Sequence, residues 1–471
     1  MSKITKYSFS QLYDMASGIS STKEQAGHGS PFASFSTVFN NYFLPDTLPD
    51  LMDTSVEEQN IYSIRAGDIL ITRTSETIDE LAMSCVATKD YPGATYSGFV
   101  KRLRPKTKGI AYHKYLAFYL RGNLFRKAVT NNAFMTLRAS FNEDIFSFLN
   151  LYLPEYEEQV RIGDMLYAIE QKIHVNTQIC DELETVAKTI YDYWFTQFDF
   201  PNAEGKPYRA SGGKMVWNEQ LKREIPEKWD DGNLYSIANP INGLACQKYR
   251  PSKGEKALPV VKIKEMHDGI TAETEKVSVN IPGKNKIHDG DILFSWSATL
   301  EVMYWFGGDA GLNQHIFKVE PVNGYSKEYV YHQFAAYVVN FVKVAESRKT
   351  TMGHITTDHL EQSRIVLPPA DIIQAFSRIV GPIHRQIGHC KKENRELSEL
   401  RDWLLPMLMN GQATMEDAEE KVDRVLSFAP QTVEVRQAAR NFGDKETDDT
   451  ANLVQAYLRR KQHDSKTQKR N

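Results

Sequence analysis

The chain has 471 residues, of which 41% are hydrophobic and 25% are charged, and this composition is typical of soluble globular proteins with about two to three domains. No apolar run is long enough to cross a bilayer and the four cysteines form no CxxC pair, so we expect a cytoplasmic protein without a zinc site or a disulfide framework. The formal net charge of −3 argues weakly against nucleic-acid binding, which makes the distribution of charge more informative than its sum.

A buried strand and a basic stretch characterise the first part of the chain. Residues 68–73 are rich in Ile and Leu and predict a buried strand. Residues 91–142 contain ten basic residues and no acidic one, a pattern that would attract phosphate. A solvated basic face without a ligand is the alternative. Residues 112–124, within this stretch, are rich in aromatic side chains and predict a helix.

A long acidic helix is predicted next. Residues 151–200 contain ten acidic and three basic residues, and their apolar positions alternate in steps of four and three, as in the a/d seam of a coiled coil. An amphipathic helix packed on its own domain is the alternative. The seam positions are Ile162, Leu166, Ile169, Ile173, Asn176, Cys180, Leu183, Ala187, Ile190 and Trp194.

The second part of the chain repeats this order. Residues 201–229 are rich in Gly, Pro and charge and predict a linker, after which residues 291–296 predict a buried strand and residues 327–344 an aromatic-rich helix. A second seam follows, with Arg401 as its one charged position, and Pro382 should kink this helix or mark its start. The other seam positions are Phe376, Val380, Ile383, Ile387, Cys390, Asn394, Leu397, Leu404 and Leu408.

Four sequence landmarks recur in the same order and indicate a duplicated domain. Residues 65–71 match 288–294, residues 153–159 match 367–374, residues 97–99 match 310–312, and residues 30–32 loosely match 258–260. The period of about 214 to 228 residues is too long for a solenoid. Each long helix also carries one Asn and one Cys at its middle, in swapped order. A buried Asn fixes the register of a coiled coil, so we predict that the two helices pair with each other.

The sequence lacks the motifs of common catalytic sites. It contains no GxxxxGK[ST], HExxH or GxSxG, and no GxGxxG after a strand. Asn239-Pro240-Ile241 lacks the second proline of an adenine methyltransferase motif, and no Glu-x-Lys follows Pro49-Asp50 as a nuclease would require. We therefore expect a non-catalytic chain without a metal site.

Two α/β domains of different sequence, each followed by a similar long helix, resemble the specificity subunit of type I restriction-modification systems over residues 7–412. The resemblance is carried by the two Gly-Asp-Ile-Leu strands, the two Leu-Pro…Gln helix starts and the bridges at residues 204–208 and 223–229. Residues 311–315 and the ends of both helices are also similar to the family. The tail beyond Met415, with eleven acidic and eleven basic residues, departs from the family's short ending.

The resemblance implies an α/β (α+β) fold with two pseudo-repeated target-recognition domains joined by two long antiparallel coiled-coil helices. The implied boundaries are 1–152 for the first recognition domain, 153–200 for the first helix, 201–229 for the linker, 230–366 for the second recognition domain, 367–412 for the second helix and 413–471 for a charged, partly disordered tail.

The resemblance also implies a function for the chain and for its partners. The chain would bind a bipartite, gapped, asymmetric target in double-stranded DNA. It would direct adenine methylation by two methyltransferase subunits and cleavage by translocase-nuclease subunits. S-adenosylmethionine, ATP and Mg²⁺ would belong to those partners, and this chain would hold no cofactor.

The length of the first helix predicts the spacing of the DNA target. Ile162 and Trp194 are 32 residue steps apart, which corresponds to roughly 48 Å at about 1.5 Å per residue. One turn of B-DNA is about 34 to 36 Å long. A helix of this length can hold two recognition domains one such turn apart, allowing for helix inclination and for attachment points inside its ends. We therefore expect the centres of the two half-sites to lie roughly 10 base pairs apart.

Candidate DNA contacts are polar side chains near the predicted strands, because Arg, Lys, Asn and Gln recognise base edges whereas Lys often holds phosphate. The alternatives are that Arg73 closes a strand, that Asn313 caps a turn and that residues 101–108 form a solvated hairpin. The candidates are Arg73, Ser75, Lys101, Arg102, Arg104, Arg138 and Asn142 in the first domain, and Ser295, Ser297, Asn313, Gln314, Arg348 and Lys349 in the second.

Two other functions compete with DNA recognition. A self-sufficient restriction-methylation enzyme would need the cofactor and base-binding motifs that the sequence lacks. A coiled-coil scaffold without nucleic acid would not need the acid-free basic stretch or two domains with dissimilar loops. We therefore expect a DNA-binding subunit.

Overall fold

The computed structural model describes residues 4–77, 80–132, 139–347, 355, 357–409, 416–418 and 420–422. These residues form two compact units, which we call unit 1 (up to His174 and from Glu396) and unit 2 (Val175 to Arg395). No helix among the described residues is long and apolar enough to span a membrane.

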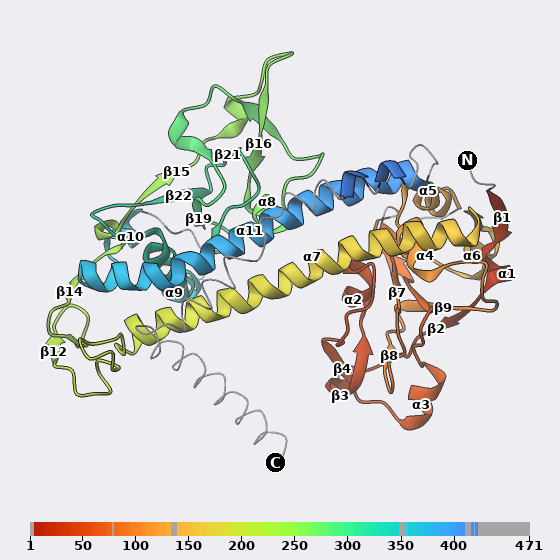
Figure 1. Cartoon of the computed structure of the whole chain (residues 1–471), viewed down its shortest axis with the longest axis horizontal. Helices are drawn as coiled ribbons and strands as arrows, with labels where there is room; N and C mark the ends of the chain where they lie inside the picture. The colour runs from red at the N-terminus through yellow and green to blue at the C-terminus, as the bar shows by residue number, and fades with distance from the viewer. Residues whose placement is uncertain are drawn as a thin grey trace. The chain divides into compact units, whose positions relative to one another are not determined.

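Unit 1 contains two main sheets, which are seen on one side of α7 in Figure 1. The larger sheet is antiparallel, in the order β2-β9-β5-β7, and the smaller sheet has the order β4-β3-β8 with β3 and β8 parallel. The strands of unit 1 are β1 (Thr5–Ser8), β2 (Tyr13–Ser17), β3 (Ala26–Ala33), β4 (Asp50–Met52), β5 (Ile69–Thr72), β6 (Thr74–Ser75), β7 (Ser84–Val86), β8 (Thr95–Tyr96), β9 (Val100–Pro105), β10 (Ala139–Ser140) and β11 (Asn150–Leu153).

Unit 2 repeats the same connections. Its antiparallel sheet has the order β15-β22-β19-β20, and its second sheet has the order β17-β16-β21-β18 with β16 and β21 parallel. The strands of unit 2 are β12 (Met215–Asn218), β13 (Arg223–Pro226), β14 (Asp230–Gly232), β15 (Ala238–Asn242), β16 (Ala257–Val261), β17 (Lys276–Ser278), β18 (Lys286–Ile287), β19 (Ile292–Ser295), β20 (Glu301–Tyr304), β21 (Ala310–Leu312), β22 (Ile316–Pro321) and β23 (Ile365–Leu367).

The strand pairing confirms the duplication and corrects one landmark. The two Gly-Asp-Ile-Leu segments form the equivalent strands β5 and β19, and β1-β11 in unit 1 corresponds to β14-β23 in unit 2. The match of residues 97–99 with 310–312 is wrong by three residues. Ala33 and Val261 pair with Tyr96 and Leu312, so the residue that corresponds to Ser97 is Asn313.

Helices cover the sheets and form the long pair. The predicted helix at 112–124 is two helices, α4 and α5, whereas the one at 327–344 is the single helix α9. The helices are α1 (Phe9–Leu12), α2 (Phe35–Asn40), α3 (Val56–Ile61), α4 (His113–Tyr119), α5 (Asn123–Asn132), α6 (Glu143–Phe148), α7 (Tyr156–Tyr191), α8 (Ile263–Asp268), α9 (Lys327–Ser347), α10 (Thr357–Glu361) and α11 (Ala370–Met409).

The long helices α7 and α11 contribute to the core of each unit. In unit 1, Ile162, Leu166 and Ile169 pack in one cluster with Leu397 and Leu404 and with the helices of the globular part. In unit 2, Val380 and Ile190 lie in the main core, whereas Leu183, Ile383 and Ile387 pack around two cysteines. Most positions of the predicted seam are therefore buried, and they are also part of each globular core.

The structure differs from the sequence-based expectations at Pro382 and in residues 201–229. Pro382 does not begin the second helix, because α11 runs through it from Ala370. Residues 201–229 are a folded element and not a simple linker, since β12 and β13 form a hairpin. Phe198, Phe200 and Trp229 anchor this segment in the core of unit 2.

Candidate nucleic-acid interface

The β8–β9 turn (residues 97–99) is a rigid corner of unit 1. Its backbone closes through a hydrogen bond from Val100 N to Ser97 O (2.8 Å), and Ser97 Oγ accepts a second one from Phe99 N (3.2 Å). Gly18 packs directly against the turn, where a Cβ would lie 2.1 Å from Ser97 O. Only glycine allows this approach, so the sequence at residue 18 determines how closely β2 holds the turn.

The β21–β22 turn (residues 313–315) has the same construction in unit 2. Ile316 N donates to Asn313 O (3.1 Å), and Asn313 Oδ1 accepts from His315 N (3.3 Å). Gly243 replaces Gly18, and a Cβ there would lie 2.0 Å from Asn313 O. The two units therefore hold corresponding turns with different side chains.

Each turn lies beside the residue that follows the central strand of its sheet. Arg73 N donates to Phe99 O (2.7 Å) in unit 1, and Trp296 N donates to His315 O (3.3 Å) in unit 2. Arg73 and Trp296 are thus equivalent, as are Phe99 and His315. The Trp296 and His315 rings lie 5.4 Å apart. Phe99 remains 60% exposed.

Lys101 and Arg73 provide positive charge beside the β8–β9 turn. Arg73 is exposed, and Lys101 Nζ donates to Ser17 Oγ (2.9 Å). Partial burial, and then the positive charge of Arg73, lower the pKa of Lys101, whereas the carboxylate of Glu143 opposes this shift. A bound phosphate would stabilise these two neighbouring cations.

Arg102 and Arg104 are structural, so we remove them from the candidate DNA contacts. Arg102 is only 9% exposed, and its Nη1 donates to Ser63 O (2.6 Å). Arg104 donates two hydrogen bonds to the buried carboxylate of Asp68, at 2.8 and 2.6 Å. The basic stretch thus includes guanidinium groups that already have internal partners.

Ser75 and Asn142 also have local structural roles. Ser75 is 9% exposed, and its Oγ accepts from Thr77 N (3.2 Å). Asn142 is exposed and caps α6, since its Oδ1 accepts from Ile145 N (3.0 Å). Its second oxygen lone pair and its amide group remain able to meet another ligand.

The candidates of unit 2 are more buried than those of unit 1. Ser295 is 1% exposed and donates to Thr299 O, while Ser297 is 6% exposed. Asn313 is 8% exposed and closes its turn, as the structural alternative predicts. Gln314 lies half-buried next to His315, with 3.2 Å between Nε2 atoms. Arg138, Arg348 and Lys349 lie outside the described residues.

Unit 2 also carries a basic group that is not among the candidates predicted from the sequence. We call it the β16–β17 cation group, and its five members are exposed and form no ion pair with another described residue. Glu255, which lies between Lys253 and Lys256 in the sequence, accepts hydrogen bonds from Ser252 N and Asn280 Nδ2, and Glu275, next to Lys276, pairs with Lys262. A search for acid-free stretches overlooks this group, although the density of Lys and Arg could have revealed it. The group comprises Lys248, Arg250, Lys253, Lys256 and Lys276.

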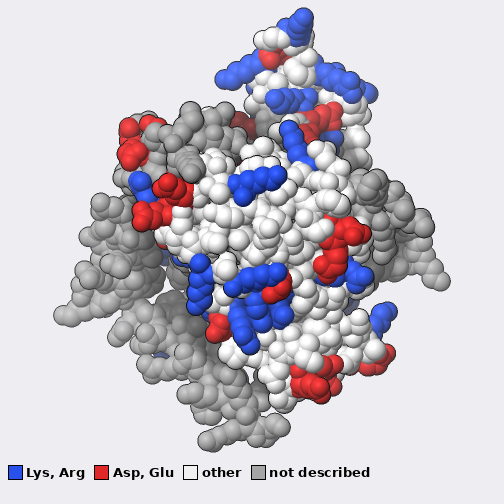
Figure 2. Space-filling view, turned by 90° about the vertical axis from the view of Figure 1, so that its right-hand side faces the viewer, with Lys and Arg blue, Asp and Glu red and all other residues white. Residues whose placement is uncertain are grey.

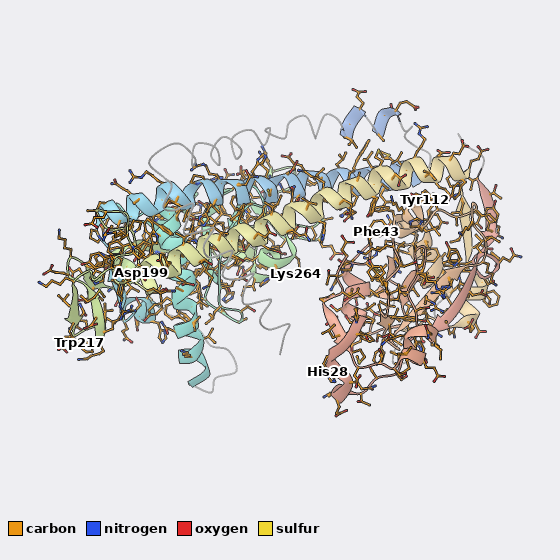
Figure 3. The ribbon with its side chains drawn as sticks, turned by 60° about the horizontal axis from the view of Figure 1, so that its bottom comes forward. His28, Phe43, Tyr112, Asp199, Trp217 and Lys264 are labelled. Carbon is orange, nitrogen blue, oxygen red and sulfur yellow. The ribbon has the colours of Figure 1, made fainter. Side chains whose placement is uncertain are left out.

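The figures show how these surfaces are distributed. Figure 2 shows a face on which Lys and Arg form small groups with acidic side chains between them. In Figure 3, His28 lies at the end of unit 1 away from α7, whereas Phe43 and Tyr112 lie next to this helix.

Polar pairs cross the helix pair in both units. In unit 2, Asn176 is 1% exposed, and its Nδ2 donates to Asn394 Oδ1 (2.9 Å) and Glu393 Oε2 (2.6 Å). In unit 1, the guanidinium of Arg401 donates to Glu170. The swapped Asn positions thus meet, and the one charged seam position has an acidic partner on α7.

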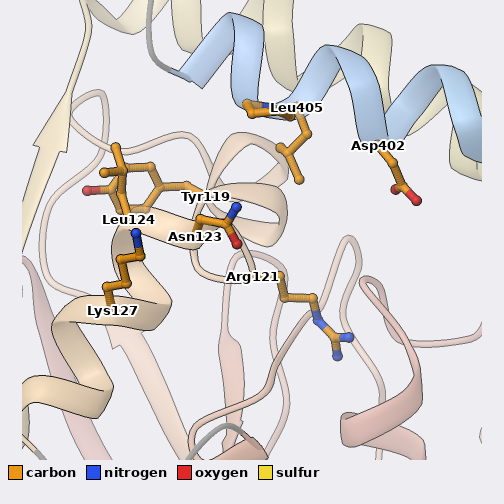
Figure 4. Close-up of a pocket in the computed structure, with 9 residues that line it drawn as sticks. Tyr119, Arg121, Asn123, Leu124, Lys127, Asp402 and Leu405 are labelled. Atoms are coloured by element: carbon orange, nitrogen blue, oxygen red, sulfur yellow. The ribbon is translucent and has the colours of Figure 1, made fainter. Parts of the chain in front are cut away.

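A pocket of about 400 Å³ lies in unit 1 beside α11. Leu405 of α11 projects toward Tyr119, Asn123 and Leu124 of the α4–α5 segment (Figure 4). Arg121 also lines the pocket, but its guanidinium donates to backbone carbonyls, including Ser84 O at 2.7 Å. Among the described residues, no group of three or more His, Cys, Asp or Glu is arranged to hold a metal ion.

Comparisons with known proteins agree on one family. A model of the type I restriction modification DNA specificity domain matches residues 8–185 and 226–399. The chain is 26% identical over 322 residues to the type I restriction enzyme HindI specificity subunit of Haemophilus influenzae, covering 57% of this chain and 70% of that protein. It is 23% identical over 385 residues to the MjaIX specificity subunit of Methanocaldococcus jannaschii, covering 78% and 82%.

A solved structure supports the fold. The type I restriction-modification S subunit from M. genitalium is similar with a TM-score of 0.54 at 14% identity, over 86% of this chain and 96% of that chain. This likeness concerns the fold and does not transfer individual contacts.

Proposed function

The chain belongs to the type I restriction-modification DNA specificity family, and from this premise we propose that each unit binds one half of a two-part site in double-stranded DNA. The observation that carries the proposal is the pair of corresponding turns at residues 97–99 and 313–315. Their backbones are held in the same way, whereas the side chains that they present differ. Two equivalent scaffolds with different contact residues are suited to an asymmetric, bipartite target.

The charge of the two units supports contact with phosphate. Arg73 and Lys101 lie together beside the turn of unit 1, and unit 2 carries the β16–β17 cation group. Contacts from lysine and arginine to phosphate position a protein on DNA without specifying sequence. We therefore assign affinity to these cations and sequence recognition to the turns.

The chain acts together with other subunits of a restriction-modification system and with DNA. We propose that it assembles with two methyltransferase subunits and with translocase-nuclease subunits. Adenine methylation and cleavage, with S-adenosylmethionine, ATP and Mg²⁺, would belong to those partners. The carboxylates on α7, including Glu157, Glu158, Asp181 and Glu182, favour a protein partner on the helix pair because they would repel DNA phosphate.

The distance between the two half-sites remains a prediction from helix length. A helix of roughly 48 Å can hold two recognition domains about 34 to 36 Å apart when it is inclined and the domains attach inside its ends, which predicts a separation of roughly 10 base pairs between half-site centres. Shortening α7 and α11 by four residues each should shrink the gap or abolish recognition. An unchanged gap in such a variant would show that the helices do not set the spacing.

Methylome sequencing tests the proposed function. A host that expresses this chain with its cognate methyltransferase subunit should carry a gapped, asymmetric adenine-methylation motif in its genomic DNA. The same host without this chain should lack the motif. If no motif depends on the chain, DNA recognition is not its function in this pairing.

A further inference from the structure

Phe99 occupies an unusual position for a large apolar side chain. It is 60% exposed, although it belongs to a turn whose three backbone N–H groups all donate hydrogen bonds within unit 1. Phe99 N donates to Ser97 Oγ and Phe99 O accepts from Arg73 N, so the backbone around it is held on both sides. A rigid turn thus presents an aromatic ring outward to solvent.

The charges around Phe99 favour a nucleic acid over an apolar protein partner. Arg73 precedes β6 and contacts the turn through its backbone, and Lys101 is two residues after Phe99. The carboxylate of Glu143 on α6 opposes the charge of Lys101. An apolar group flanked by two cations matches a base edge flanked by phosphates.

The equivalent position in unit 2 carries a residue of different chemistry. His315 replaces Phe99, and Gln314 lies next to it with 3.2 Å between the Nε2 atoms. Imidazole and amide groups recognise hydrogen-bonding groups, whereas a phenyl ring recognises apolar ones. The two half-sites should therefore differ at the base pair that this position meets.

We propose that Phe99 is a specificity-determining residue that contacts the methyl group of a thymine in the half-site of unit 1. The thymine methyl is the apolar group that base pairs expose in the major groove. Arg73 and Lys101 hold the neighbouring phosphates, and Ser97 and Gly18 position the turn. This proposal rests on the proposed function and names a contact within it.

The first test compares methylation motifs of Phe99 variants in the host genome. Phe99→Ala should lower discrimination at one A·T pair of one half-site by roughly 10-fold, which is the lower end of the usual effect of one mismatched pair. The other half-site should not change. Phe148→Ala is the matched control, because Phe148 is 70% exposed in the same unit but lies on α6.

The second test removes the methyl group from the DNA. Purified complexes of the chain with its methyltransferase subunits bind a duplex that carries the motif, with thymine or uracil at the relaxed position. The wild-type complex should bind the uracil duplex about 4-fold more weakly, because the contact with one methyl group is lost. Phe99→Ala should bind both duplexes equally, and Phe99→Leu should keep part of the preference.

The outcomes separate this proposal from the proposed function. If the wild-type chain yields no motif, DNA recognition itself is refuted. If a motif exists but Phe99→Ala gives the same methylation motif as Phe148→Ala, only the role of Phe99 is refuted. The same holds if the Phe99→Ala complex still binds the uracil duplex more weakly than the thymine duplex. If Phe99→Ala does not assemble, the two duplexes are tested with Phe99→Leu and with the wild type. The proposal is overturned if neither protein distinguishes the thymine duplex from the uracil duplex.

Discussion

Replacing Gly243 by alanine should disturb the β21–β22 turn of unit 2. A Cβ at this position would lie 2.0 Å from Asn313 O and 2.7 Å from Leu312 O. Both neighbours are backbone atoms, so neither can rotate away, and the turn must separate from the end of β15. The hydrogen bonds from Gly243 N to Ile316 O (3.0 Å) and from Leu244 N to Leu312 O (2.8 Å) would weaken with it.

The expected cost follows from these two effects. Overpacking by one methyl group costs about 1–3 kcal/mol. Each weakened backbone hydrogen bond contributes about 1 kcal/mol more. We expect the free energy of unfolding of unit 2 to fall by roughly 3–5 kcal/mol, of which about 1–3 kcal/mol comes from overpacking and about 2 kcal/mol from the two weakened hydrogen bonds.

Hydrogen exchange and methylome sequencing together measure this effect. The amides of Leu244 and Ile316 should exchange faster in Gly243→Ala, and discrimination should decline in one half-site only. Gly283→Ala is the control within the same unit, since its Cβ would meet no atom within 4 Å. The reasoning is refuted if Gly243→Ala is as stable and as specific as Gly283→Ala.

Three further predictions concern buried polar groups. Arg104→Ala should destabilise unit 1 by about 3 kcal/mol in urea unfolding, because it leaves the carboxylate of Asp68, whose side chain is 1% exposed, without its cation. Relaxed DNA specificity with unchanged stability would instead make Arg104 a DNA contact. Asn176→Ala should lower the free energy of unfolding by about 1–3 kcal/mol in the same assay, because buried Glu393 loses a hydrogen-bond donor. The double variant Asn176→Leu with Asn394→Leu should recover part of this loss, because it removes both amides. Full stability of the single variant would contradict the contact. Burial and then the charge of Lys391 lower the pKa of His384 to about 4, and burial, His384 and Lys188 also lower the pKa of His332. The unfolded chain therefore binds more protons than the folded chain below about pH 6.5. The stability of unit 2 should fall as the pH drops from there toward 4. His384→Phe should flatten this pH dependence of the free energy of unfolding. An unchanged pH profile would show that His384 and His332, whose Nε2 atoms are 3.1 Å apart, are not the cause of the pH dependence.

Periodicity made the helix pair predictable from the sequence. The steps of four and three identified Ile162 and Leu397 as buried, and the swapped Asn positions correctly indicated that Asn176 and Asn394 meet. The strands around the two Gly-Asp-Ile-Leu segments were predictable because each apolar run is short and follows a glycine, which favours a buried strand over a helix. These features depend on local patterns that recur over many residues.

The candidate contacts were less predictable, because composition does not reveal direction. Residues alternate between the two faces of a strand, so Arg102 and Arg104 share one face of β9, where Asp68 and Ser63 O receive them. Lys101 points the other way. A count of basic residues treats all three alike, and only the pairing of β9 with β5 and β2 separates them.

Phe99 was missed for a related reason. An aromatic residue between Gly98 and Val100 suggests a core position, and nothing local shows that the turn presents it to solvent. Its exposure depends on Gly18 and on Arg73, which are distant in sequence. The landmark at residues 97–99 was also misaligned, so the comparison with His315 was not available from the sequence.

The corresponding turns indicate which residues the scaffold requires and which it leaves free. Ser97 and Asn313 differ in type, yet each supplies an oxygen that accepts from the amide two residues later. Gly18 and Gly243 are both required, because a side chain would strike the turn. Arg73 and Phe99 engage the scaffold through their backbones and expose their side chains, which can therefore vary without altering the fold. In unit 2, by contrast, Trp296 packs against the core and against the His315 ring. A protein built this way can change the DNA sequence that it binds by changing the residues that face outward, while its turns keep their shape.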